Sequence, residues 1–83
     1  MNSTIMVIKI GNRSHSATKV QELLTEYGCH IKTRVGFHHT SDDFCSEDGI
    51  IILQLTAYKE TNDGLVLKLN KLPQVEAQII SFK

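Results

Sequence analysis

Two hydrophobic periodicities alternate along this 83-residue chain, and their order limits the folds it can adopt. Four segments are apolar at every second position or continuously, which predicts strands. Two segments are apolar at every third or fourth position, which predicts amphipathic helices. The predicted strands are Thr4–Ile10, Cys29–His38, Gly49–Tyr58 and Val75–Phe82, and the predicted helices are Ala17–Tyr27 and Asp63–Leu72.

The resulting order, β-α-β-β-α-β, is that of the split βαβ or ferredoxin-like sandwich, an α+β fold. It predicts an antiparallel four-stranded sheet with both helices on one face. The pattern accounts for the whole chain, so we expect a single domain over residues 1–83. A domain this small buries a modest share of its surface, and oligomerisation is a common remedy.

The strand patterns predict which side chains form the core. The first strand is almost continuously apolar, which is typical of a central strand covered on both faces. In the second strand we expect Val35 to face the helices and Arg34 to face away. Ile31, Leu53 and the helix residues Val20, Leu24 and Leu69 are expected in the same core.

The face of the sheet without helices is predicted to carry an apolar patch with a polar rim. Such a patch usually marks an interface, although isolated surface isoleucines are also ordinary. We therefore expect a homodimer or tetramer through this face or the sheet edge. The residues assigned to the interface are Arg34, Ile50, Ile52, Ile80 and Phe82.

The charge balance argues against a dedicated nucleic-acid binder. Lys and Arg number 9, Asp and Glu also number 9, and the formal net charge is zero. Nucleic-acid binding normally needs a basic excess. No apolar run is long enough to span a bilayer, and the N-terminus lacks a signal-peptide pattern, so we expect a cytoplasmic protein. Cys29 and Cys45 are then expected as free thiols.

The turn after the first strand is one candidate ligand site. Gly11, Asn12, Arg13 and Ser14 precede the first helix, and Ser14 or Ser16 can cap it. Backbone N–H groups at a helix N-terminus bind anions. The turn matches neither a P-loop nor G-x-G-x-x-G, so a nucleotide site is disfavoured and an ordinary tight turn stays open.

The second candidate site is metal-binding. His38, His39 and Cys45 lie near the end of the second strand and in the polar segment His39–Asp48, which we expect to be a long loop. Imidazole and thiolate suit transition metals, but the spacing matches no closed zinc pattern. Adjacent strand residues face opposite ways, so a shared ion requires a bulge. The alternative is a solvated polar loop with incidental histidines.

Four segments carry a resemblance to a known family: KVQELLTEYG, IKTRVGFH, GIIILQL and LVLKLNKLPQVEAQIISFK. They resemble the small stand-alone regulators of the iron-only hydrogenase system. Those regulators are similar to ACT domains and to the C-terminal domain of the nickel-responsive repressor. The resemblance runs roughly from Ile5 to Lys83, with Arg34-Val35-Gly36 among its best marks.

The resemblance implies a regulatory, small-ligand-binding oligomer rather than an enzyme, with the cofactor unknown. An ACT-like effector site maps to Gly11, Asn12 and Arg13. His39 and Cys45 stand at a spacing similar to part of the nickel-repressor site, whose alternate-position histidine pair is absent here. A metal sensor using His38, His39 and Cys45 is therefore the alternative function. We find no catalytic constellation.

Overall fold

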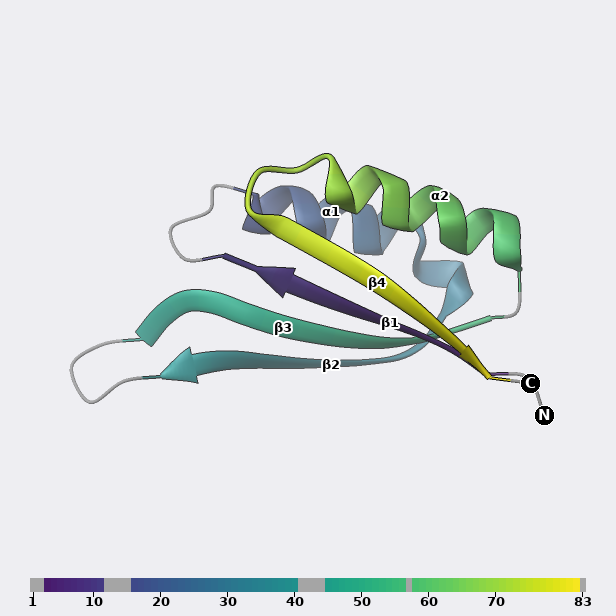
Figure 1. Cartoon of the computed structure of the whole chain (residues 1–83), viewed down its shortest axis with the longest axis horizontal. Coiled ribbons are helices and arrows are strands. Elements are labelled where there is room, and N and C mark those ends of the chain that lie inside the picture. Colours follow the sequence, from purple (N-terminus) through teal and green to yellow (C-terminus); the bar gives the residue numbers. More distant parts are fainter. Residues whose placement is uncertain (1–2, 12–15, 41–44, 57, 83) are drawn as a thin grey trace.

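The structure, a computed structural model, describes residues 3–11, 16–40, 45–56 and 58–82, and gives only the backbone of 37–40 and 45–48. The sheet has the order β2-β3-β1-β4 with every neighbouring pair antiparallel, and both helices lie on one face of it (Figure 1). This arrangement confirms the predicted ferredoxin-like α+β fold. The elements are β1 (Ser3–Ile10), α1 (Ala17–Glu26), the 3₁₀ helix η1 (Gly28–His30), β2 (Ile31–Thr40), β3 (Cys45–Leu55), α2 (Lys59–Asn70) and β4 (Val75–Phe82).

The core lies between the helix layer and the sheet. Alternate residues of each strand point toward the helices, while residues four apart on each helix point back. Met6, Ile8 and Leu53 from the sheet are fully buried, as are Val20 and Leu69 from the helices. The rest of the buried apolar set is Ile10, Leu24, Ile51, Leu55, Leu65, Val75 and Ala77.

Strand β1 lies in the interior of the sheet, between β3 and β4. Its inward residues Met6 and Ile8 are buried, whereas its outward residues Ile5 and Val7 are only half-buried. Within the described chain the helices cover one face of this strand, although its sequence is apolar toward both faces. We call the uncovered side the open face.

A β-bulge in strand β2 overturns part of the predicted alternation. The register with β3 shifts between Ile31 and Thr33, so that Arg34 pairs with the buried Leu53. A one-residue shift exchanges the two faces of a strand. Arg34 accordingly lies on the helix side and donates a 2.6 Å hydrogen bond to Gln21 Oε1. Val35, predicted in the core, is 45% exposed instead.

The hairpin of β2 and β3 is longer than the sequence predicted. The expected loop His39–Asp48 is largely strand, because β2 continues to Thr40 and β3 begins at Cys45, its register partner. Strand β1 ends at Ile10, opposite Gly49. The hairpin therefore extends past the end of β1 as a two-stranded arm (Figure 1).

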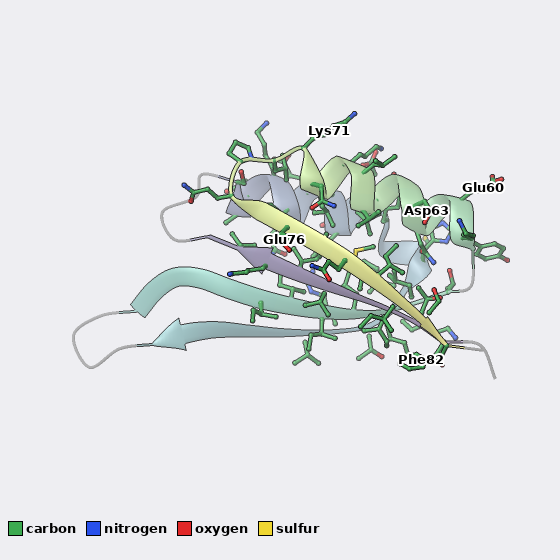
Figure 2. The ribbon with its side chains drawn as sticks, in the orientation of Figure 1. Glu60, Asp63, Lys71, Glu76 and Phe82 are labelled. Atoms are coloured by element: carbon green, nitrogen blue, oxygen red, sulfur yellow. The ribbon has the colours of Figure 1, made fainter. Side chains whose placement is uncertain are left out.

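The helix boundaries also differ from the predicted ones. Helix α2 begins at Lys59, four residues before the predicted start. Asp63, which is labelled in Figure 2, lies within the helix and accepts a 2.8 Å hydrogen bond from Lys59. Asn62 is of a residue type favoured at helix N-caps, but it lies within α2, is buried and donates to the carbonyl of Thr56 at 2.8 Å. Gly28 opens η1 and, like the other described glycines, has no positive φ, so it does not end α1 in the left-handed conformation that glycine often adopts there. No described helix has the length and apolarity needed to cross a membrane.

Replacing Leu53 by alanine is expected to destabilise the protein by about 2–5 kcal/mol, because it opens a cavity at a site that is 0% exposed. Leu67→Ala is the matched control, since the Leu67 side chain on α2 is 63% exposed. The control is expected to change the free energy of unfolding by less than about 0.5 kcal/mol. Urea denaturation measures both, and equal losses would contradict the placement of the core.

Candidate functional site

A pocket of about 300 Å³ lies at the end of β1, where that strand meets the start of β4. Strand β1 runs into the predicted ligand turn at this point, and β4 begins beside it. The pocket therefore joins the predicted turn to a segment more than sixty residues later in the chain. Its lining residues are Lys9, Gly11, Gln74, Val75 and Glu76.

Gly11 and Gln74 make the closest approach in this pocket. The N–H of Gly11 donates a 2.7 Å hydrogen bond to the carbonyl of Gln74. A Cβ atom on Gly11 would lie 3.0 Å from the Cβ of Gln74, a contact so tight that a side chain at position 11 would require Gln74 to shift. Gln74 has a φ of 60°, a left-handed conformation that non-glycine residues adopt at an energetic cost. Backbone strain of this kind often accompanies ligand sites.

Ser16 fixes the same region from the start of α1. It is the N-cap residue of α1, and its carbonyl accepts the first helical hydrogen bond from Val20. The sequence suggested that the Ser16 hydroxyl caps the helix. Instead, this buried hydroxyl donates to the carbonyl of Pro73 at 2.9 Å. The chain is thus anchored to the α2–β4 connection on both sides of residues 12–15.

The pocket offers polar groups of both charges. Lys9 and Glu76 are register partners on the β1–β4 ladder, and both are exposed. The ammonium of Lys9 is a donor, the carboxylate of Glu76 is an acceptor, and the Gln74 amide is both. A volume of about 300 Å³ is at the lower end of small-molecule sites. The arrangement suits a small polar ligand with groups of both charges.

The predicted effector residues are only partly placed by the structure. Gly11 lines the pocket, whereas Asn12 and Arg13 lie outside the described residues. The sequence analysis missed Lys9, Gln74 and Glu76. Lys9 could have been noticed from the sequence, because it is the single charged residue in an almost continuously apolar strand. Gln74 and Glu76 had none, since their contact with the turn depends on the pairing of β1 with β4.

The side chains of the candidate metal ligands His38, His39 and Cys45 lie outside the described residues. The backbone shows a register shift between His38 and Thr40, with Thr40 opposite Cys45. Such an irregularity is what a shared ion at adjacent histidines requires. Among side chains that the structure describes, no group of three His, Cys, Asp or Glu residues could hold a metal.

The candidate interface residues separate into two groups. Ile50, Ile80 and Phe82 are exposed on the open face, and Ile52 is half-buried there. Arg34 is wrongly placed by the sequence, since it lies on the helix side. The open face gains three apolar residues that the prediction omitted: Ile5, Val7 and Val35.

A second, larger hollow of about 580 Å³ runs between the two helices. It is lined by three lysines and two glutamates together with the apolar Leu23 and Leu72. Lys68 there lies 5.0 Å from the centre of the Tyr27 ring and 3.8 Å from Glu26. A hydrogen bond to Tyr27, and then the charge of Glu26, raise the pKa of Lys68. These mutual contacts are those of an ordinary groove between packed helices.

Comparison with solved structures places the fold among ACT and PII-like proteins. The uncharacterized protein TM1266 from Thermotoga maritima has a TM-score of 0.83 and 25% identity over 100% of both chains. The ACT domain of GTP pyrophosphokinase from Chlorobium tepidum has a TM-score of 0.62 and 13% identity, covering 96% of this chain and 97% of that one.

The nitrogen regulatory PII-like protein CPII from Thiomonas intermedia K12 has a TM-score of 0.55 and 12% identity, covering 98% of this chain and 88% of that one. CPII is also known with ADP, AMP and acetate bound. No protein-family model and no curated protein matches the chain. These likenesses show an ACT-like ferredoxin fold.

Replacing Gly11 by alanine is expected to cost about 1–3 kcal/mol of stability, because the new methyl group would overpack against Gln74. Gln74→Gly should be neutral or slightly stabilising. The substitution removes roughly 1–2 kcal/mol of left-handed backbone strain. Glycine also makes the unfolded chain more flexible, which lowers the stability by about 0.5–1 kcal/mol.

The double variant tests the contact directly. Because Gln74→Gly removes the side chain that the new methyl group at position 11 would meet, we expect the loss from Gly11→Ala to shrink in that background. Thermal denaturation of the four proteins gives the coupling. Strictly additive effects would show that the two residues do not touch as the structure places them.

Proposed function

We propose that this chain is a regulatory module that binds a small polar ligand in the pocket at the end of β1. The observation that carries the proposal is the meeting of Gly11 with the strained Gln74, between a lysine and a glutamate. Strain maintained at a surface pocket is characteristic of a binding site. The pocket volume favours a ligand of amino-acid size over a whole nucleotide.

The neighbours support a binding function by analogy of fold. CPII is described as nitrogen regulatory and has been seen with small molecules, and the pyrophosphokinase segment is an ACT domain. Shared fold alone leaves the ligand open. We therefore rest the position of the site on this chain's own pocket and use the neighbours only for the class of function.

We further propose that the module acts as an oligomer and that it binds its ligand without converting it. The proposed target of regulation is the iron-only hydrogenase system. Both that target and a cytoplasmic location rest on the sequence alone. An effector-binding role needs only differential affinity for two states of the protein or of its partner.

Ligand binding is expected to depend on Lys9. The probes are the standard amino acids, AMP, ADP and acetate, tested by chemical-shift perturbation in NMR spectra. We expect one of them to shift the amide signals of Gly11, Gln74 and Glu76 together. Lys9→Ala should weaken that binding by about tenfold or more, the effect of a lost charge-assisted hydrogen bond.

Lys19→Ala is the matched control for this experiment. Lys19 is exposed on α1 and lines the groove between the helices rather than the pocket. The Lys19→Ala variant is expected to bind the probe with the affinity of the wild type. Shifts around Lys19 and Lys71 in place of those around Gly11 would move the site to the groove.

A transition-metal sensor is the second candidate function, favoured by the register shift beside His38 and His39. Cys45 is the register partner of Thr40, so the three proposed ligands belong to one hairpin, near its far end. This alternative uses residues separate from the pocket, so the two functions can be tested independently.

Native mass spectrometry with Ni²⁺ or Zn²⁺ tests the metal site. If it exists, the protein should retain about one ion per subunit, and Cys45→Ser should lose it, because thiolate is the strongest ligand of the set. Cys29→Ser is the control, since Cys29 is an exposed free thiol on η1. Equal metal retention in all three proteins would exclude a role for Cys45.

A further inference from the structure

The groove between α1 and α2 lies on the outer side of the helix layer, away from the sheet and from the pocket at the end of β1. It holds about 580 Å³. Its lining residues on α1 run at helical spacing from Lys19 to Glu26, which is about 10 Å along the helix axis. Its apolar part consists of Leu23 and Leu72, which are both half-buried. The groove is therefore a strip about two helical turns long with an apolar centre.

One end of the groove is occupied by contacts within the chain. Lys68 lies over the ring of Tyr27 and 3.8 Å from Glu26, so its charge is already matched. The hydroxyl of Tyr27 also lies 3.5 Å from the place where a Cβ atom on Gly64 would stand, which shows how closely the two helices approach there. This end has no unmatched charge to offer a partner.

The other end of the groove carries two lysines that have no partner within the described chain. Lys19 and Lys71 are both exposed, and neither side chain makes an ion pair or a hydrogen bond with a described residue. The hydrogen bond from Ser16 to the carbonyl of Pro73 holds the start of α1 beside the end of α2, so both lysines belong to this end. Figure 2 labels Lys71 on the side of the helix layer away from the sheet. We call this the lysine end.

We propose that the groove docks an acidic amphipathic helix of a partner protein. Apolar side chains of that helix would contact Leu23 and Leu72, and its carboxylates would meet the lysine end. A third helix packs between two others by setting ridges of side chains into their groove, and such helices present apolar anchors at helical spacing. Charge selects the acidic kind. Once Lys68 and Glu26 have neutralised each other, the lining keeps two lysines and the single Glu22.

The position of Lys19 supports this choice, because the stability of α1 does not explain it. Lys19 is the third residue of α1, and the first turn of this helix contains no acidic residue. The N-terminus of a helix carries a partial positive charge, which disfavours a cation in the first turn. A carboxylate supplied by a partner would offset both the lysine and the helix terminus.

Other occupants fit the charges less well. A second copy related by two-fold symmetry would set the lysine end either against the same end or against the matched pair of Lys68 and Glu26. Neither arrangement brings a surplus of carboxylates to the lysines. Nucleic acid needs a basic excess, which a groove lined by two glutamates does not provide. The inference goes beyond ligand binding, and it stands whether or not the pocket holds a ligand.

Two synthetic peptides of about 18 residues test the groove, since isolated helices shorter than about 12–15 residues are marginal in water. Both carry leucines at every third or fourth position. One has glutamates beside this stripe, and the other has lysines at the same positions. We expect the glutamate peptide to shift the NMR amide signals of Leu23 and Leu72 and to bind about fivefold more tightly than the lysine peptide or better.

Reversing the charges at the lysine end should reverse this preference. The double variant Lys19→Glu, Lys71→Glu is expected to bind the glutamate peptide about tenfold more weakly or worse and the lysine peptide more tightly, because attraction becomes repulsion. Lys19→Glu alone should slightly raise the midpoint temperature of unfolding, because a carboxylate is favoured in the first turn of a helix. A loss of binding in that variant therefore cannot come from unfolding.

Lys32→Glu is the matched control, since Lys32 is exposed on β2 and does not line the groove. It should bind both peptides as the wild type does. Leu23→Ala should weaken both peptides, because it removes part of the apolar centre, and circular dichroism checks that the variant is folded.

Three results would overturn the proposal. The first is that neither peptide binds, or that the double variant keeps the preference of the wild type. The second is that the peptides shift amides of the open face in place of those of Leu23 and Leu72. The third is that, without peptide, the double variant Lys19→Glu, Lys71→Glu sediments with a smaller mass than the wild type, which would assign the groove to a second copy. The amino-acid and nucleotide probes of the pocket are unaffected by these results, so the proposed function is judged separately.

Discussion

The fold depends on a sheet whose central strand is apolar on both faces. Helices α1 and α2 both lie on one side of the sheet, so their buried residues, such as Leu24 and Leu69, cover only the inner face. The apolar side chains on the inner face pack against the two helices. The described chain contains no buried side-chain polar atom without a hydrogen-bond partner. On the open face, Ile5 and Val7 stay half-buried, and neither described helix lies over them. The described chain is therefore closely packed on the helix side of the sheet and uncovered on the other side.

Local patterns were sufficient for most of the fold. The four strands, two helices and their order could be read from periodicity, and β4 was placed at its observed bounds. The faces of β2 could not be read, because the bulge after Ile31 exchanges them and nothing in the local sequence announces it. Val35 and Arg34 were misplaced for that single reason. The start of α2 was missed because Asn62 resembles a cap but serves Thr56 from within the helix.

The candidate site was predictable only in its first half. Gly11 was found because turn chemistry between a strand and a helix is a local signal. Gln74 and Glu76 come from the opposite end of the chain, and only the β1–β4 register brings them to the turn. The same register explains why glycine suits position 11, since a Cβ atom there would lie only 3.0 Å from the Cβ of Gln74. A site whose residues are brought together by strand pairing therefore cannot be predicted from each segment of the sequence separately.

The position of the pocket links it to the open face. On that face strands β1 and β4 present Ile5, Val7, Ile80 and Phe82 toward one end of their pairing and the charged register partners Lys9 and Glu76 toward the other. Lys9 and Glu76 also line the pocket. The strand pairing that directs alternate residues into the core therefore also fixes where the pocket lies relative to the apolar residues of the open face.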